Sequence, residues 1–325
     1  MPDTFDDFFP RTSTVMDRGD RLRRVPWAAL VTFVAVSFGL AWLVSMPLWL
    51  ASGDSQASAL FNRILPVVTM FTPLIAAAVV VFVMKVPRRE WARFLGLWPL
   101  RPAKRVVWFA VIMTVAPMVL VFACIAISAL FGWIHLDLVH FSGFQETLDA
   151  RIEESMLRPI ALASVAVIPL ASVFNALPAF AEEAGWRGWL LPALRPLGTW
   201  PALLLSGAIW GLWHSPIILL GQNFDEPNIW GVLLMTGGCI AWGVLFGWLR
   251  LRTGSIWPAV IGHGSLNASG NLVFLVGTAG DSANLPLVNP LGVSGWIVIG
   301  IVVIVLALTG QFKREPQLRR QSVRQ

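Results

Sequence analysis

Long apolar stretches, separated by short polar segments, run along most of the chain. A helix that crosses a bilayer needs about 20 mostly apolar residues, and about eight stretches meet this criterion by hydropathy. They are residues 26–50, 64–84, 106–132, 158–181, 200–220, 229–249, 255–278 and 292–311. The pattern therefore predicts an all-α protein, a polytopic membrane helix bundle with about eight transmembrane helices.

The two ends of the chain are polar, unlike its centre. Residues 1–25 mix Asp and Arg with few apolar side chains, and residues 312–325 are basic and polar. We expect a polar N-terminal tail, one integral membrane domain over residues 26–311, and a basic C-terminal tail. No small-residue cleavage site follows the first apolar stretch, which is typical of a retained transmembrane helix and not of a removed signal peptide.

Composition and charge fit a membrane protein. Hydrophobic residues make up 56% of the chain and charged residues 13%, against about 25% charged residues in an ordinary soluble domain. These fractions exclude a disordered protein and a cytosolic enzyme. The formal net charge of +6 is compatible with nucleic-acid binding, so the positions of the charges must decide whether such a partner is needed.

The positive charges are distributed unevenly between the two predicted sides of the membrane. Of the 24 Lys and Arg residues, all but three (Arg63, Arg151 and Arg158) fall on one side. This asymmetry predicts that the basic side is cytoplasmic, so that both termini are cytoplasmic. We expect an integral protein of a bacterial cytoplasmic membrane, whose basic excess faces anionic lipid and needs no nucleic-acid partner.

Two pairs of glycines lie in neighbouring predicted helices. Gly207 and Gly211 are four residues apart, as are Gly243 and Gly247. This spacing lets helix backbones approach closely in a membrane. It predicts a tightly packed bundle and carries no information about chemistry.

Ionisable groups are costly at membrane depth, and most of those in the apolar stretches fall into three clusters. The first cluster follows stretch 158–181 and contains Glu182, Glu183 and Arg187. Glu183 and Arg187 are four residues apart, which predicts an ion pair on one helix face. Glu182 points about 100° away and should have other partners. A charged helix end at the membrane surface is the simpler interpretation, but the apolar residues on both sides favour a functional site.

The second and third clusters place histidines within apolar stretches. His214 follows Trp210 by one turn, and His263 and Asn267 share one face of stretch 255–278. Hydrogen bonds between helices would explain each cluster separately. Together with the first cluster, however, they bring Glu, His and Asn side chains into one apolar bundle, which favours a catalytic site.

The remaining histidines and the two cysteines lie outside these clusters. We expect His135 and His140 to be surface residues of the longest outside loop. Cys124 and Cys239 lie in apolar runs, and we expect them to be small buried residues that form no disulfide or metal site.

The three clusters, in this order, resemble the three motifs of a known family. It is the CAAX protease and bacteriocin-processing family, also called the Abi family, whose members are intramembrane endopeptidases. The matching residues are Glu182, Glu183, Arg187, Trp210, His214, His263 and Asn267. The resemblance covers residues 160–275, which would form a protease-like core. The family usually has Phe at the position of Trp210, and Trp keeps an apolar ring there.

The resemblance implies roles for four of these residues. Peptide hydrolysis needs an activated water, stabilisation of the oxyanion and a proton donor for the leaving amine. Glu182 would be the general base, and His214 would help to hold and deprotonate the water. His263 and Asn267 would donate hydrogen bonds to the oxyanion. The spacing of the residues does not decide which glutamate is the base.

The other three motif residues have supporting roles in this interpretation. Glu183 and Arg187 would pair and fix the helix end. Trp210 would contribute its ring next to His214.

The sequence leaves the cofactor unknown, with a divalent metal such as zinc as one alternative. Glu182, His214 and His263 resemble a zinc-binding set. The chain has no HExxH motif, however, in which two zinc-binding histidines lie four residues apart. A metal-free glutamate mechanism suits the same residues.

Two other classes of function remain as alternatives to an endopeptidase. A non-catalytic membrane protein of the same fold, such as an immunity factor or scaffold, would keep its effect when the motif residues are replaced. A proton-coupled transporter would use Glu182 and the histidines as a relay, and transporters often contain internal repeats, which we do not detect here. For an endopeptidase, we expect the partner to be a membrane-embedded or lipidated protein or peptide.

Overall fold

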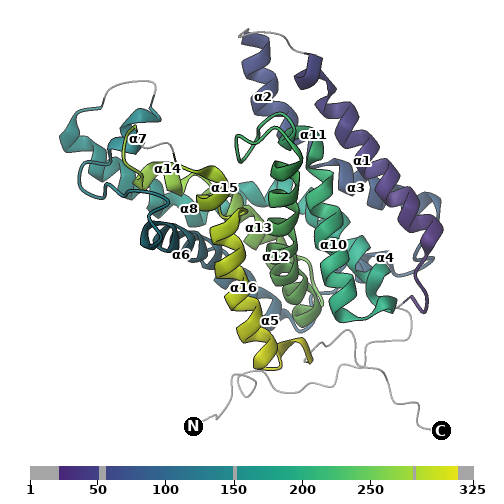
Figure 1. Cartoon of the computed structure of the whole chain (residues 1–325). Coiled ribbons are helices and arrows are strands. Elements are labelled where there is room, and N and C mark those ends of the chain that lie inside the picture. The colour runs from purple at the N-terminus through teal and green to yellow at the C-terminus, as the bar shows by residue number, and fades with distance from the viewer. Residues whose placement is uncertain (1–21, 51–55, 149–151, 281–282, 314–325) are drawn as a thin grey trace, which may run out of the picture.

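The computed structural model describes residues 22–50, 56–148, 152–280 and 283–313 (Figure 1). Within these ranges every named element is helical, and one isolated antiparallel bridge joins Leu136 to Gly277. The predicted all-α fold is therefore confirmed. The predicted tails, residues 1–25 and 312–325, lie almost entirely outside the described residues.

Helices of very different lengths follow one another along the chain. The first half contains α1 (Trp27–Leu50), α2 (Gln56–Thr69), α3 (Thr72–Ala78), α4 (Trp91–Phe94), α5 (Ala103–Met113), α6 (Ala116–Leu130) and α7 (Ser142–Glu146). The second half contains α8 (Glu154–Glu183), α9 (Leu191–Leu194), α10 (Thr199–Trp213), α11 (Ser215–Ile218), α12 (Ile229–Thr253), α13 (Trp257–Ser269), α14 (Leu272–Val276), α15 (Leu285–Val288) and α16 (Val293–Leu308). Val79–Val83 and Ala184–Leu190 are π-helical, and Arg195–Leu197 and Gln311–Lys313 are 3₁₀ turns.

Seven segments of the described chain are long and apolar enough to cross a membrane. They are Trp27–Leu50, Leu60–Val83, Ala103–Leu130, Glu154–Leu197, Ile229–Thr253, Trp257–Val276 and Leu285–Leu308. They agree with the predicted polytopic membrane helix bundle. The cytoplasmic orientation of both termini stays a prediction.

The predicted span 200–220 is not one continuous helix, which accounts for the difference between about eight spans and seven. Helix α10 ends at Trp213 after 15 residues, and α11 begins at Ser215 with Pro216 in its first turn. Pro216 has no N–H group to donate to the carbonyl of Leu212, four residues earlier, and its ring clashes with that carbonyl, so the helix breaks at His214. At about 1.5 Å per residue, α10 is shorter than a hydrocarbon core of about 30 Å.

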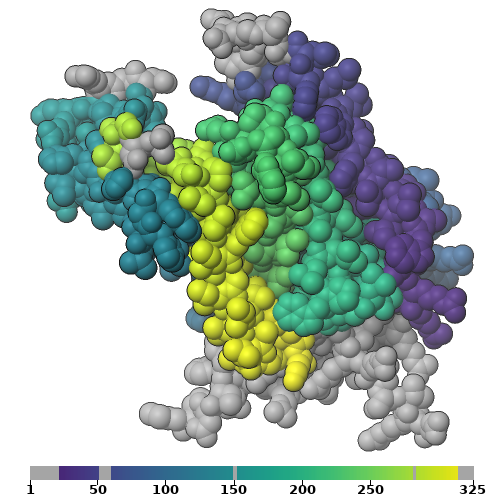
Figure 2. Space-filling model, viewed as in Figure 1, coloured from purple at the N-terminus to yellow at the C-terminus, as the bar shows by residue number. Residues whose placement is uncertain are grey.

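Two helix pairs position the residues of the three clusters. Helix α10 packs against α12, and α8 packs against α13. Figure 1 shows α10, α12 and α16 running through the middle of the molecule, with α1 on one flank. In Figure 2, α16 (yellow) lies beside the green helices, and α1 (purple) covers their other side.

The glycines of α10 lie at its contact with α12, as their spacing predicted. A Cβ atom at Gly207 would lie 2.7 Å from the Cα of Ile240, and one at Gly211 would collide with the Cα of Thr236. From the α12 side, a Cβ at Gly243 would lie 3.1 Å from the Cα of Gly207. Because these neighbours are backbone atoms, a larger residue would force the two helices apart.

Gly264 makes the corresponding contact between α13 and α8. A Cβ atom there would lie 2.5 Å from the carbonyl oxygen of Ser172 and 2.8 Å from the backbone nitrogen of Ala176.

Replacing Gly264 with Ala should therefore lower the free energy of unfolding by about 1–3 kcal/mol, measured by thermal unfolding of the full chain in detergent. Gly300→Ala on α16 is the control, since a Cβ at Gly300 meets no atom within 4 Å. Equal melting temperatures of the two variants would contradict this account of the α8–α13 contact.

Candidate active site

Helix α8 ends with two buried glutamates. Glu182 and Glu183 occupy its last turn and are 2% and 0% exposed. The chain continues as the π-helical segment Ala184–Leu190, all of whose residues are buried. Gly185 in this segment lies against α3, where a Cβ atom would come within 2.5 Å of the Pro73 side chain. Both carboxylates therefore lie in the packed interior and not on a surface helix end.

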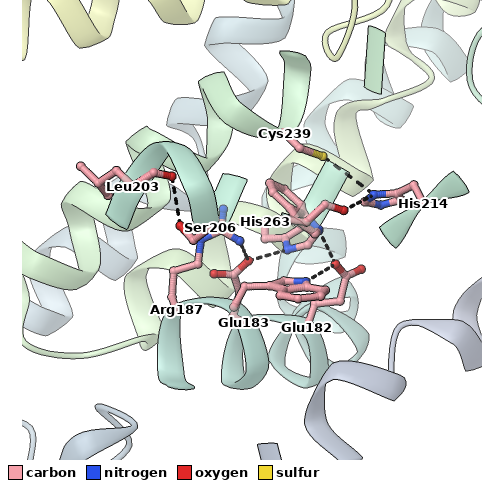
Figure 3. Close-up of polar contacts among 10 residues, drawn as sticks. Glu182, Glu183, Arg187, Leu203, Ser206, His214, Cys239 and His263 are labelled. Carbon is pink, nitrogen blue, oxygen red and sulfur yellow. Dashed lines mark hydrogen bonds and ion pairs between the residues drawn. The ribbon is translucent and has the colours of Figure 1, made fainter. Parts of the chain in front are cut away.

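The predicted ion pair between Glu183 and Arg187 is present. Nη1 of Arg187 donates to Oε1 of Glu183 at 2.7 Å, and both side chains are buried. Nδ1 of His263 lies 2.9 Å from the same oxygen (Figure 3). Because an ionised carboxylate can only accept, Nδ1 donates, and Nε2 of a neutral ring is then the acceptor. Glu183 therefore fixes the orientation of the His263 ring as well as pairing with Arg187.

Glu182 has different partners from Glu183, as its direction on the helix predicted. Its Oε2 atom accepts hydrogen bonds from the indole N–H groups of Trp186 at 3.0 Å and Trp210 at 2.7 Å. All three side chains are buried. We did not expect a polar role for Trp186. Its spacing of four residues from Glu182, equal to that between Glu183 and Arg187, is the signal in the sequence that points to it.

Trp210 brings the three clusters together. Its backbone carbonyl accepts a hydrogen bond from Nδ1 of His214 at 2.9 Å, and its ring centroid lies 5.3 Å from that of His263. The guanidinium group of Arg187 lies 4.3 Å from the centroid of the indole, a favourable cation–π distance. Together with the bond to Glu182, these contacts of the Trp210 indole and backbone connect residues of α8, α13 and the end of α10.

His214 lies at the break between α10 and α11 and contacts α12. Because a backbone carbonyl only accepts, Nδ1 donates to Trp210, and Nε2 of the neutral ring keeps its lone pair. Sγ of Cys239 lies 3.9 Å from the same Nδ1 atom. Cys239 and Cys124 are both free and buried, as predicted.

Asn267 stands apart from the other predicted catalytic residues. It lies one turn after His263 on α13, and its side chain is exposed. Among the described residues, no hydrogen bond joins its amide to Glu182, His214 or His263. A contact of Asn267 with an oxyanion stays a prediction.

The three residues of the predicted zinc set do not form a ligand group. Within the part of the chain that the structure describes, no three His, Cys, Asp or Glu side chains gather in a way that could hold a metal ion. Zinc needs three or four such ligands around one point, and Oε2 of Glu182 is already bound by two indole N–H groups. The arrangement of these residues does not fit a bound zinc ion.

His135 and His140 are exposed in the loop before α8, as predicted. Nδ1 of His140 lies 2.6 Å from Oε1 of Glu154, and this partner raises the pKa of His140. The hydroxyl of Ser142 donates to Asp137 at 2.6 Å and lowers the pKa of that carboxyl group. These contacts organise the loop and involve none of the motif residues.

Comparison with known proteins finds similarity over the region that holds the three clusters. Residues 161–269 match a family model described as type II CAAX prenyl endopeptidase Rce1-like. The CAAX prenyl protease 2 of Methanococcus maripaludis is 30% identical over 103 residues, which are 30% of this chain and 38% of that relative. The chain therefore matches less than half the length of this relative. All seven motif residues lie within the range of the family model.

Proposed function

We propose that this chain belongs to the CAAX protease and bacteriocin-processing family, as its match to the Rce1-like family model supports, and that it is an intramembrane endopeptidase. Its reaction is the hydrolysis of a peptide bond in a membrane-associated protein or peptide, by water that a glutamate and a histidine activate. The description of the family model, a prenyl endopeptidase, supports this reaction class.

The observation that carries the proposal is the arrangement of Glu182, His214 and His263 around Trp210. Glu182 bonds the indole, His214 bonds the carbonyl, and the His263 ring packs against the indole. A carboxylate and two histidines are costly inside an apolar bundle. Groups of this kind, gathered from three helices, are typical of an active site.

Glu182 and His214 act on the attacking water in this proposal. Oε2 of Glu182 is occupied by two N–H groups, so Oε1 is the oxygen that takes a proton. Nε2 of His214 accepts a hydrogen bond from the water, because its Nδ1 already donates to Trp210. As the water oxygen attacks the carbonyl carbon, one of its protons passes to Glu182.

His263 and Asn267 act on the oxyanion. When Nε2 of His263 carries a proton, it donates a hydrogen bond to the negative oxygen. The hydrogen bond from Nδ1 to the Glu183 carboxylate, 2.9 Å long, holds the ring in the orientation for this contact. The Asn267 amide is the second donor. When the C–N bond breaks, its electron pair goes to the nitrogen, which takes the proton held by Glu182.

The position of the site supports a membrane-associated substrate. Glu182 and His263 belong to segments that are long and apolar enough to cross a membrane, so the scissile bond has to enter the apolar bundle. A membrane-embedded or lipidated chain does so at lower cost than a soluble one. The matching family model is described as a CAAX prenyl endopeptidase. We therefore take as the probe peptide a farnesylated peptide that ends in Cys, two aliphatic residues and a variable residue.

Membrane proteomics tests the proposal even while the natural substrate is unidentified. Cells that produce the wild-type chain are compared with cells that produce Glu182→Ala at the same level. We expect an uncleaved protein or peptide to accumulate with Glu182→Ala and not with the wild type, because the variant lacks the base. His214→Ala should give the same accumulation, since it removes the acceptor for the water.

Identical membrane proteomes would contradict the endopeptidase. A biological effect that survives in Glu182→Ala cells would then favour the non-catalytic immunity or scaffold protein. Substrate flux across vesicles that contain the purified chain, lost with Glu182→Ala, would favour the proton-coupled transporter.

A further inference from the structure

Two tryptophans hold Glu182 from different parts of the fold. Trp186 belongs to the π-helical segment Ala184–Leu190, and Trp210 belongs to α10. Their N–H groups lie 3.0 and 2.7 Å from the same oxygen of Glu182, Oε2. An indole N–H can only donate. We call this pair of donors the indole clamp.

The indole clamp supplies hydrogen-bond donors to the buried carboxylate of Glu182. The buried Arg187 bonds the other carboxylate, that of Glu183, and so does not neutralise Glu182 by direct contact. A buried charge without a paired cation requires hydrogen-bond donors, and bonds to an ionised acceptor are among the strongest in proteins. The two indole N–H groups are the side-chain donors that Glu182 has in the described structure.

The indole clamp also distinguishes the two oxygens of Glu182. Both N–H groups bind Oε2, and in Figure 3 the dashed lines at Glu182 end on one of its two carboxylate oxygens. Trp210 is itself held in place by the guanidinium of Arg187 over its ring and by the bond from His214 to its carbonyl.

We propose that Trp186 and Trp210 are positioning residues, which hold Glu182 by Oε2 so that Oε1 accepts the proton of the attacking water. The inference rests on the proposed function for the role of Glu182 as a base. The hydrogen bonds themselves can be tested without a substrate. The two parts therefore need separate measurements.

The first measurement is the NMR spectrum of ¹⁵N-labelled tryptophan side chains in the full chain, held in lipid nanodiscs. The variants W186F and W210F assign the two indole N–H signals. We expect both signals to move upfield in Glu182→Ala, because the carboxylate acceptor is lost. The signal of Trp242, an equally buried indole that donates to the Pro290 carbonyl at 2.8 Å, should stay in place. If the chemical shifts of the Trp186 and Trp210 signals are the same in the wild-type chain and in a folded Glu182→Ala chain, the two indoles do not bind Glu182 and the proposal is wrong.

The second measurement is the cleavage of the probe peptide by the same variants. W186F and W210F should each lower kcat by about tenfold, the size of effect expected when one hydrogen bond to a charged group is lost. KM should stay unchanged, because both indoles are buried. W242F is the control and should keep the wild-type kcat. Wild-type kcat in the double variant W186F and W210F would overturn the positioning role. A wild-type chain that cleaves nothing would overturn the proposed function, while the NMR result still decides whether the clamp exists.

Discussion

Glu182→Gln should lower kcat for the probe peptide by about 10²–10⁴-fold, the usual contribution of a general base. The amide has the shape of the carboxylate and a carbonyl oxygen that still accepts from Trp186 and Trp210. It cannot take a proton from water. We therefore expect the melting temperature of the purified chain in detergent to stay close to that of the wild type, while turnover is lost.

Glu154→Gln is the matched control for this variant. Glu154 begins the same helix, α8, but its side chain is 73% exposed and contacts His140 in the loop. The same change of charge should leave kcat unaltered there. Equal losses of activity in the two variants would mean that charge, and not a base at position 182, is what the reaction needs.

Arg187→Met should be strongly destabilising. Arg187 and Glu183 are almost fully buried, with side chains 2% and 0% exposed. Removal of one partner of a buried ion pair leaves an uncompensated charge and costs about 3–5 kcal/mol. The loss would appear as a lower free energy of unfolding in denaturant titrations of the full chain. Cleavage should fall as well, because Arg187 also holds the ring of Trp210.

A double variant separates the charge from the packing. Arg187→Met combined with Glu183→Gln removes both charges, so part of the lost stability should return. Activity should not return with it, because the ionised Glu183 holds His263. If the double variant is less stable than Arg187→Met, the unpaired carboxylate of Glu183 is not the cause of the lower free energy of unfolding.

Contacts within one helix could be predicted from the sequence. The bond between Glu183 and Arg187, and the different direction of Glu182, follow from the period of 3.6 residues per turn. The small-residue spacing of Gly207 and Gly211 also predicted that their face of α10 approaches another helix closely, although not which atoms it meets there. The family resemblance, carried by motif residues in a fixed order, extended these local predictions to three helices.

Contacts between helices could not be predicted in the same way. No spacing indicates that the Trp210 indole bonds Glu182, or that His263 bonds Glu183 rather than another acceptor, because these contacts depend on how α8, α10 and α13 pack. Hydropathy also predicted one span over 200–220, since it averages over residues and is insensitive to the helix break at His214, where Pro216 removes a backbone hydrogen bond. The exposure of Asn267 is likewise a result of packing.

One measurement tests most directly whether this chain hydrolyses peptide bonds with Glu182 as the base. The purified full chain in nanodiscs is incubated with the probe peptide in water enriched in ¹⁸O, and the products are weighed by mass spectrometry. Water attack predicts that the new carboxyl terminus carries one ¹⁸O atom with the wild-type chain, and that Glu182→Gln forms no product above background. A product without ¹⁸O, or equal product formation by Glu182→Gln, would contradict the account.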